Sequence, residues 1–111
     1  MYHEINGSAA VNFSDLPHEE GVKFAKKMSR HSGPSFNGRA TYPGYRHIPS
    51  AYILTEKDEV LVPEFQQRMI AFLEEETAEK VNVVHIDTGH CPNASAPEKV
   101  AASVREILGY C

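Results

Sequence analysis

The stretch Val81-Asn82-Val83-Val84-His85-Ile86-Asp87-Thr88-Gly89-His90-Cys91-Pro92 decides the fold of this chain. Its β-branched apolar run predicts a buried strand, which ends at the Gly89-His90 turn and is followed by an amphipathic helix. A histidine just past the end of a buried strand presents an imidazole at the rim of a sheet, where open α/β folds bind their ligands. The central question for the rest of the chain is which side chain would be the partner of this histidine.

The composition of the 111-residue chain is that of one small globular domain, with 41% hydrophobic and 23% charged residues. A formal net charge of −4 argues against nucleic acid or an anionic membrane as the main partner. No apolar run approaches the roughly 20 residues that cross a bilayer, and Met1–Ile5 does not have the character of a secretory signal. Cys91 and Cys111 are expected to be free thiols in a reducing compartment. We therefore expect a cytoplasmic protein with no nucleic-acid or membrane partner.

The first part of the chain predicts one helix and a long irregular connection. Residues Met1–Phe13 show no sustained period, and Gly7–Ala10 is expected to be a loop. Asp15 is the expected N-cap of a helix with Pro17 near its start and Phe24 and Met28 on its apolar side; we expect this helix to end between Ser29 and His31. Gly33–His47 is expected to be irregular, with Ala40–Tyr42 as a candidate short strand.

The second part of the chain predicts strand, helix, strand and helix. Pro49–Thr55 is short and apolar and predicts a buried strand, followed by the polar turn Glu56–Glu59. Pro63 opens a helix with the expected apolar stripe Phe65, Met69, Phe72 and Leu73. The strand Val81–Ile86 follows. The last helix is expected to begin at a capping box, Ser95-Ala96-Pro97-Glu98, to bury Val100, Val104, Ile107 and Leu108, and to end at Gly109.

This order of elements predicts an α/β fold in one domain. Two apolar strands joined by a helix should lie parallel, with a right-handed crossover. Parallel strands are buried on both faces and need neighbours, yet this chain offers two clear strands and helices for little more than one layer. We therefore expect the end of a larger sheet, with an exposed edge that favours self-association.

Asp58 and His90 occupy equivalent places, each in the turn after a predicted parallel strand. A carboxylate there would accept a hydrogen bond from one imidazole nitrogen, fix the tautomer and leave the other nitrogen as a general base. A free imidazole pKa of about 6.5 suits that role. The alternative is structural, because a histidine in a Gly-His-x-Pro turn can simply cap the turn. Asp87 is a weaker rival acid because it stands at the end of its own strand.

Other candidate sites have less support from the sequence. Ser35 lies in a Pro-rich loop and Ser95 is expected to cap a helix, so neither is a good nucleophile. The Cys91 thiol is next to His90, but neighbouring side chains in a turn usually diverge. A zinc site from His85, His90 and Cys91 lacks a recognised ligand spacing. No cofactor or metal is expected, and the remaining histidines are expected at the surface: His3, His18, His31 and His47.

Two segments resemble the α/β-hydrolase superfamily, in which the triad acid precedes the histidine. The run Ile48–Asp58, continued by Val62-Pro63-Glu64-Phe65-Gln66-Gln67-Arg68-Met69-Ile70, is similar to the acid-bearing region. The similarity is closest to the branch of plant methyl esterases and hydroxynitrile lyases with their fungal relatives. There a strand ends in a polar turn with the triad Asp, and the next helix carries a Pro, a Phe-Gln and a Met-Ile.

Gly89-His90-Cys91-Pro92, with the later Ser95-Ala96-Pro97, resembles the triad-histidine segment of that branch, which reads Gly-His-Ser-Pro with a later Ser-x-Pro. Cys91 thus replaces a common Ser. Phe13–Pro17 is similar to the end of the lid in fungal members. The resemblance implies that residues 1–47 are a lid remnant and irregular connection, and that 48–111 carry strand, helix, strand and helix.

The resemblance implies a Ser-Asp-His triad in which Asp58 orients His90, and a substrate that is an ester or related acyl compound of a small apolar molecule. The nucleophile of this family stands in Gly-x-Ser-x-Gly, a pattern that these 111 residues do not contain. The chain by itself is therefore expected to be a poor hydrolase, two thirds of a triad. The alternatives are a truncated, non-catalytic binding or regulatory protein that keeps this end of the fold as a scaffold, and a lyase on the same scaffold.

Overall fold

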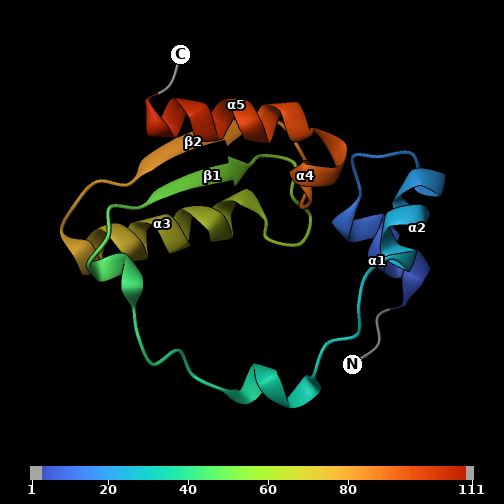
Figure 1. The fold of residues 1–111 in the computed structure, drawn as a ribbon, viewed down its shortest axis with the longest axis horizontal. Coiled ribbons are helices and arrows are strands. Elements are labelled where there is room, and N and C mark those ends of the chain that lie inside the picture. The colour runs from blue at the N-terminus through green and yellow to red at the C-terminus, as the bar shows by residue number, and fades with distance from the viewer. Residues whose placement is uncertain (1–3, 110–111) are drawn as a thin grey trace.

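The computed structural model describes residues 4–109, so the expectations for His3 and Cys111 lie outside the described residues. The chain forms two helical segments at its N-terminal end, a long connection, and a strand-helix-strand-helix unit (Figure 1). The elements are α1 (Ile5–Asn12), α2 (His18–Lys26), η1 (Gly33–Asn37), η2 (Gly44–Arg46), β1 (Ala51–Thr55), α3 (Pro63–Thr77), β2 (Asn82–Ile86), α4 (Pro92–Ser95) and α5 (Pro97–Leu108).

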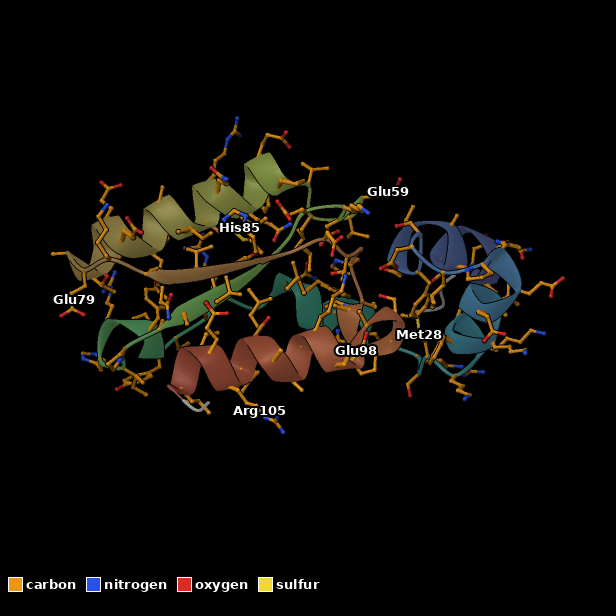
Figure 2. All side chains as sticks on the ribbon, turned by 90° about the horizontal axis from the view of Figure 1, so that it is seen from above. Met28, Glu59, Glu79, His85, Glu98 and Arg105 are labelled. Carbon is orange, nitrogen blue, oxygen red and sulfur yellow. The ribbon has the colours of Figure 1, made fainter. Side chains whose placement is uncertain are left out.

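The sheet consists of β1 and β2, which pair in parallel with Ala51 opposite Asn82 and Thr55 opposite Ile86. The crossover helix α3 packs on β1 and α5 packs on β2. Figures 1 and 2 show these two helices on opposite sides of the strands. The predicted α/β class and the parallel pairing are confirmed.

The parallel ladder continues beyond the strands and fixes the turns that follow them. The Glu56 amide donates to the Ile86 carbonyl at 2.9 Å, and the Lys57 amide donates to the Thr88 carbonyl at 3.0 Å. The turn after β1 and the loop after β2 are therefore held side by side at the carboxyl end of the sheet.

The apolar stripe predicted for α3 is only partly buried. Phe65 and Phe72 are 47% and 54% exposed, whereas Gln66 and Ile70 are buried against the sheet. Two strands are too narrow to cover the whole stripe. The same holds for α5, where Ser103 is buried and Val104 and Leu108 are exposed.

The N-terminal segment is a helix, so the loop expected at Gly7–Ala10 is wrong. Tertiary packing stabilises this helix although its sequence shows no helical period, because Ala9 and Phe13 form a buried cluster with Ala25 of α2. The start of α1 is capped by the Glu4 side chain, which accepts hydrogen bonds from the amides of Asn6 and Gly7. Cys91 and Ala94 pack against this cluster, so the α1–α2 hairpin is seated on the segment that follows the Gly89-His90 turn.

Three further expectations for the first part of the chain are wrong. The N-cap of α2 is Pro17 without a side-chain cap, and the helix ends at Lys26, before Met28. No strand forms at Ala40–Tyr42; this part of the chain runs from α2 through η1 and η2 to β1 (Figure 1), and the sheet contains β1 and β2. Among residues 4–109, no helix has the length and apolar character to cross a membrane.

Candidate active site

Asp58 is the acid at the carboxyl end of β1, and its carboxylate is saturated with hydrogen bonds. The residue is 5% exposed. Oδ1 accepts from the amides of Val60 at 2.8 Å and Leu61 at 2.9 Å. Oδ2 accepts from the Thr55 hydroxyl at 2.9 Å. Such an Asx-type turn directs the carboxylate across the end of the sheet, toward the loop after β2.

His90 lies within hydrogen-bonding distance of both oxygens of this carboxylate. Its Nδ1 is 3.1 Å from Oδ1 and 3.0 Å from Oδ2 of Asp58. The imidazole side chain is 28% exposed, and Nε2 has no hydrogen-bond partner among the residues that the structure describes. An ionised carboxylate that accepts from Nδ1 selects the tautomer with its proton there, which leaves the lone pair of Nε2 free to accept a proton.

Gln66 of α3 holds the backbone on either side of Asp58 through hydrogen bonds, a role that the sequence did not indicate. Its side-chain amide donates to the carbonyls of Thr55 at 2.9 Å and Leu61 at 2.6 Å, and its oxygen accepts from the Thr55 amide at 3.1 Å. The residue is 1% exposed. A buried polar side chain with all its bonds made fixes the turn on both sides of Asp58.

The electrostatics of the pair favour an ionised Asp58. Burial opposes the charge, but the hydrogen bonds from His90, Leu61, Val60 and Thr55 outweigh it and lower the pKa of this carboxyl below its ordinary value. Asp58 is therefore charged at neutral pH, as an acceptor for an imidazolium requires.

Asp15 reaches the same loop from the linker between α1 and α2. Its Oδ2 accepts from the Gly89 amide at 2.9 Å and from the Ser95 hydroxyl at 2.6 Å. The predicted helix-capping roles of Asp15 and Ser95 are both wrong. The N-cap of α5 is Ala96, without a side-chain cap, because the Ser95 hydroxyl is directed to the carboxylate instead. Sequence spacing could not pair residues 74 and 80 positions apart.

The rival acid Asp87 points elsewhere, to Lys99 of α5, with 2.5 Å between the carboxylate and the ammonium. His85 of β2 lies 3.7 Å from Glu56 at the surface, where Figure 2 shows it on the side of α3. The residues that the structure describes contain no group of three or more His, Cys, Asp or Glu that could hold a metal ion.

Cys91 and Ser35 do not lie in environments that suit a nucleophile. Burial and the nearby carboxylates of Asp58 and Asp15 raise the pKa of the Cys91 thiol, which disfavours the thiolate. The Ser35 hydroxyl contacts His31 at 2.8 Å on exposed η1, a segment well separated from the sheet in Figure 1.

An open hollow of about 250 Å³ borders the pair. Its polar lining is Thr55, Asp58, Gln66 and His90, and its other lining side chains are mainly apolar: Tyr52, Ile53, Leu61, Pro92 and Val100. The hollow extends along β1 and places apolar surface next to the imidazole.

Comparison with known proteins agrees with this architecture. Residues 6–103 match the alpha/beta hydrolase family. The chain is also 42% identical over 109 residues to "Probable hydrolase R7" of Phoma sp.; the match covers 98% of this chain and 45% of that protein. This chain therefore belongs to the α/β hydrolase family, and it spans somewhat less than half the length of this relative.

Proposed function

We propose that Asp58 and His90 are the acid and the base of a Ser-His-Asp triad, in a hydrolase that cleaves an ester or related acyl bond of a small apolar molecule. The observation that carries this proposal is the contact of His90 Nδ1 with both carboxylate oxygens of buried Asp58, at 3.1 and 3.0 Å. Family membership supports it, because this pair stands at the ends of two parallel strands in the order of that fold.

In this mechanism Nε2 of His90 removes the proton from an attacking serine hydroxyl and later gives it to the leaving group. Asp58 holds the Nδ1–H tautomer and stabilises the imidazolium that forms in between. The serine does not belong to a Gly-x-Ser-x-Gly pattern of these 111 residues, so the reaction requires a nucleophile outside them.

The apolar wall beside His90 favours an apolar acyl or alcohol group as substrate. The run from Ile48 to Ile70 resembles the branch of plant methyl esterases and hydroxynitrile lyases, so we assign the chain to that branch. Within it we favour ester hydrolysis over cyanohydrin cleavage. The relative from Phoma sp. is named as a hydrolase, which supports this choice.

The test is a chimera in which this chain replaces the matched 45% of the Phoma sp. protein. We expect turnover of p-nitrophenyl butyrate and a loss in kcat of at least about 10³-fold in His90→Ala, because a triad acts as a unit. His85→Ala is the matched control, since this histidine lies on β2 at the surface and its Nδ1 is 3.7 Å from the Glu56 carboxylate.

Equal turnover by the His90→Ala chimera would contradict the proposed role of His90. Robust, His90-dependent turnover by the 111-residue chain alone would contradict the requirement for an external serine. A chimera that cleaves mandelonitrile and not the ester would identify the lyase alternative.

A further inference from the structure

Asp15 binds the loop of His90 on both sides of the histidine. Gly89, the residue before it, donates its amide to Asp15 Oδ2, and Ser95, five positions after it, donates its hydroxyl to the same oxygen. These contacts join residues 74 and 80 positions apart, so the α1–α2 linker holds the His90 loop as a clasp. We use the name Asp15 clasp for this set of three residues.

The clasp is closely fitted at Gly89. A Cβ atom at this position would lie 2.9 Å from Asp15 Oδ1 and 3.1 Å from Ser14 Oγ, so only glycine allows the linker this near. Asp15 has no capping role in α2 that would explain its position. The carboxylate is thus directed to the loop that carries His90.

The charge of Asp15 strengthens both bonds. Burial opposes ionisation, but the bonds from Gly89 and Ser95 outweigh it and lower the pKa of this carboxyl. Hydrogen bonds to a carboxylate are stronger than neutral ones, so two charge-assisted bonds hold the loop before and after His90.

We propose that Asp15 is a positioning residue that holds His90 against Asp58. This inference rests on the proposed function, because it gives His90 the role of base. Asp58 fixes the imidazole from the β1 side through Nδ1, and Asp15 fixes the backbone that carries it. A movement of the α1–α2 hairpin therefore changes the direction of Nε2, which makes the hairpin part of the catalytic geometry.

The test uses the 111-residue chain, with ¹⁵N NMR of the imidazole nitrogens and hydrogen exchange of the Gly89 amide. In Asp15→Ala we expect His90 to shift toward the Nε2–H tautomer that free imidazole prefers, and the Gly89 amide to exchange at least about tenfold faster. Asp15→Asn should be less disturbed than Asp15→Ala, because its carbonyl oxygen can still accept both bonds, although these bonds lose the strengthening by charge. Ser95→Ala should lie between the two.

A loss of structure alone cannot produce this ranking of the effects of Asp15→Ala, Ser95→Ala and Asp15→Asn. The amide spectrum and the His85 ring signals report whether a variant is folded, and Ser95→Ala decides the question if Asp15→Ala does not fold. A folded Asp15→Ala with wild-type tautomer overturns the proposal, as does a Ser95→Ala variant with unchanged His90 signals and Gly89 exchange. Asp15→Asn as disturbed as Asp15→Ala also overturns it.

The outcome is separable from that of the proposed function. If Asp15→Ala changes the tautomer while the chimera does not need His90, the clasp is correct and the catalytic role is wrong. If the chimera needs His90 and the tautomer does not respond to the Asp15 substitution, the catalytic role is correct and the clasp is wrong.

Discussion

Removing the Asp58 carboxylate tests the candidate site most directly, because four donors converge on it. They are the amides of Val60 and Leu61, the Thr55 hydroxyl and His90 Nδ1. Asp58→Ala removes the carboxylate that accepts from all four donors. Asp58→Asn keeps the shape and one oxygen, which can remain with the two backbone amides, but places an NH₂ group where Oδ2 meets His90.

The loss in unfolding free energy depends on how far water can replace the carboxylate as a hydrogen-bond acceptor. Val60 is 43% exposed and the His90 side chain 28% exposed, so these donors find solvent when the acceptor is removed. For these two donors the full penalty for a buried unsatisfied group therefore does not apply, and the buried Thr55 hydroxyl keeps a second acceptor in Gln66 Oε1 at 3.4 Å. At about 1 kcal/mol net per bond, Asp58→Ala should lower the free energy of unfolding by about 4 kcal/mol, and Asp58→Asn by about 1–2 kcal/mol.

Urea unfolding followed by circular dichroism measures these losses, and ¹⁵N NMR measures the tautomer. In Asp58→Asn the amide donates to Nδ1, so His90 should change to the Nε2–H form, and the chimera should lose about 10⁴-fold in kcat. Asp87→Asn is the matched control, because Asp87 contacts Lys99 instead. An Asp58→Asn variant with wild-type tautomer and turnover would refute the reasoning.

The hydrogen bonds to Asp58 also make the free energy of unfolding depend on pH. The pKa of Asp58 in the folded chain lies below its ordinary value of 3.8. Its stabilisation is therefore complete above that value and is lost as the pH falls through the lowered pKa. Asp15 and Asp87 also have lowered pKa values and act in the same direction. The difference in unfolding free energy between wild type and Asp58→Asn isolates Asp58, and it should shrink as the pH falls below 3.8. A constant difference down to complete protonation would contradict the ionised state.

Three further predictions concern residues around the site. Gln66→Ala should lower the free energy of unfolding by about 3 kcal/mol in urea titrations, because it leaves buried hydrogen bonds of the β1 turn unmade. Substitution of its exposed neighbour, Gln67→Ala, should change the free energy little. Equal effects would contradict the supporting role of Gln66. Ala78, at the end of α3, has a φ of 58°; Ala78→Gly should therefore raise the unfolding free energy by about 1 kcal/mol, and the matched Ala71→Gly within α3 should lower it by about 1 kcal/mol. The raised pKa of Cys91 predicts slow alkylation by iodoacetamide at neutral pH, which peptide mass spectrometry measures. An alkylation rate equal to that of the chain unfolded in urea would contradict this prediction.

The sequence predicted the strands and their turns because these depend on local patterns. The β-branched run before Gly89 and the short apolar run before Asp58 each specify a strand, and the crossover rule makes the two strands parallel. The catalytic roles of Asp58 and His90 remain predictions.

The clasp and the Gln66 contacts could not be predicted because they depend on tertiary packing. Gln66 looks like a surface position beside an apolar stripe, yet it is buried because its amide finds partners in the β1 turn. Asp15 looks like a helix cap, but the packing of α1 on α2 directs it to Gly89 instead. For Asp15 the predicted helix cap is wrong, because the amide of Gly89, 74 positions away, is its partner.

The position of the pair follows from the strand register. The ladder extends past Thr55 and Ile86 to the Lys57–Thr88 bond, so Asp58 comes directly after the last paired residue of its strand, and His90 stands two positions beyond Thr88 on the other strand. The position of Asp58 thus depends on the sheet and on α3. His90 stands farther beyond the ladder, and the Asp15 clasp holds its loop from the hairpin. The hairpin is therefore the element through which a change distant from the sheet can reach His90 while Asp58 stays in place.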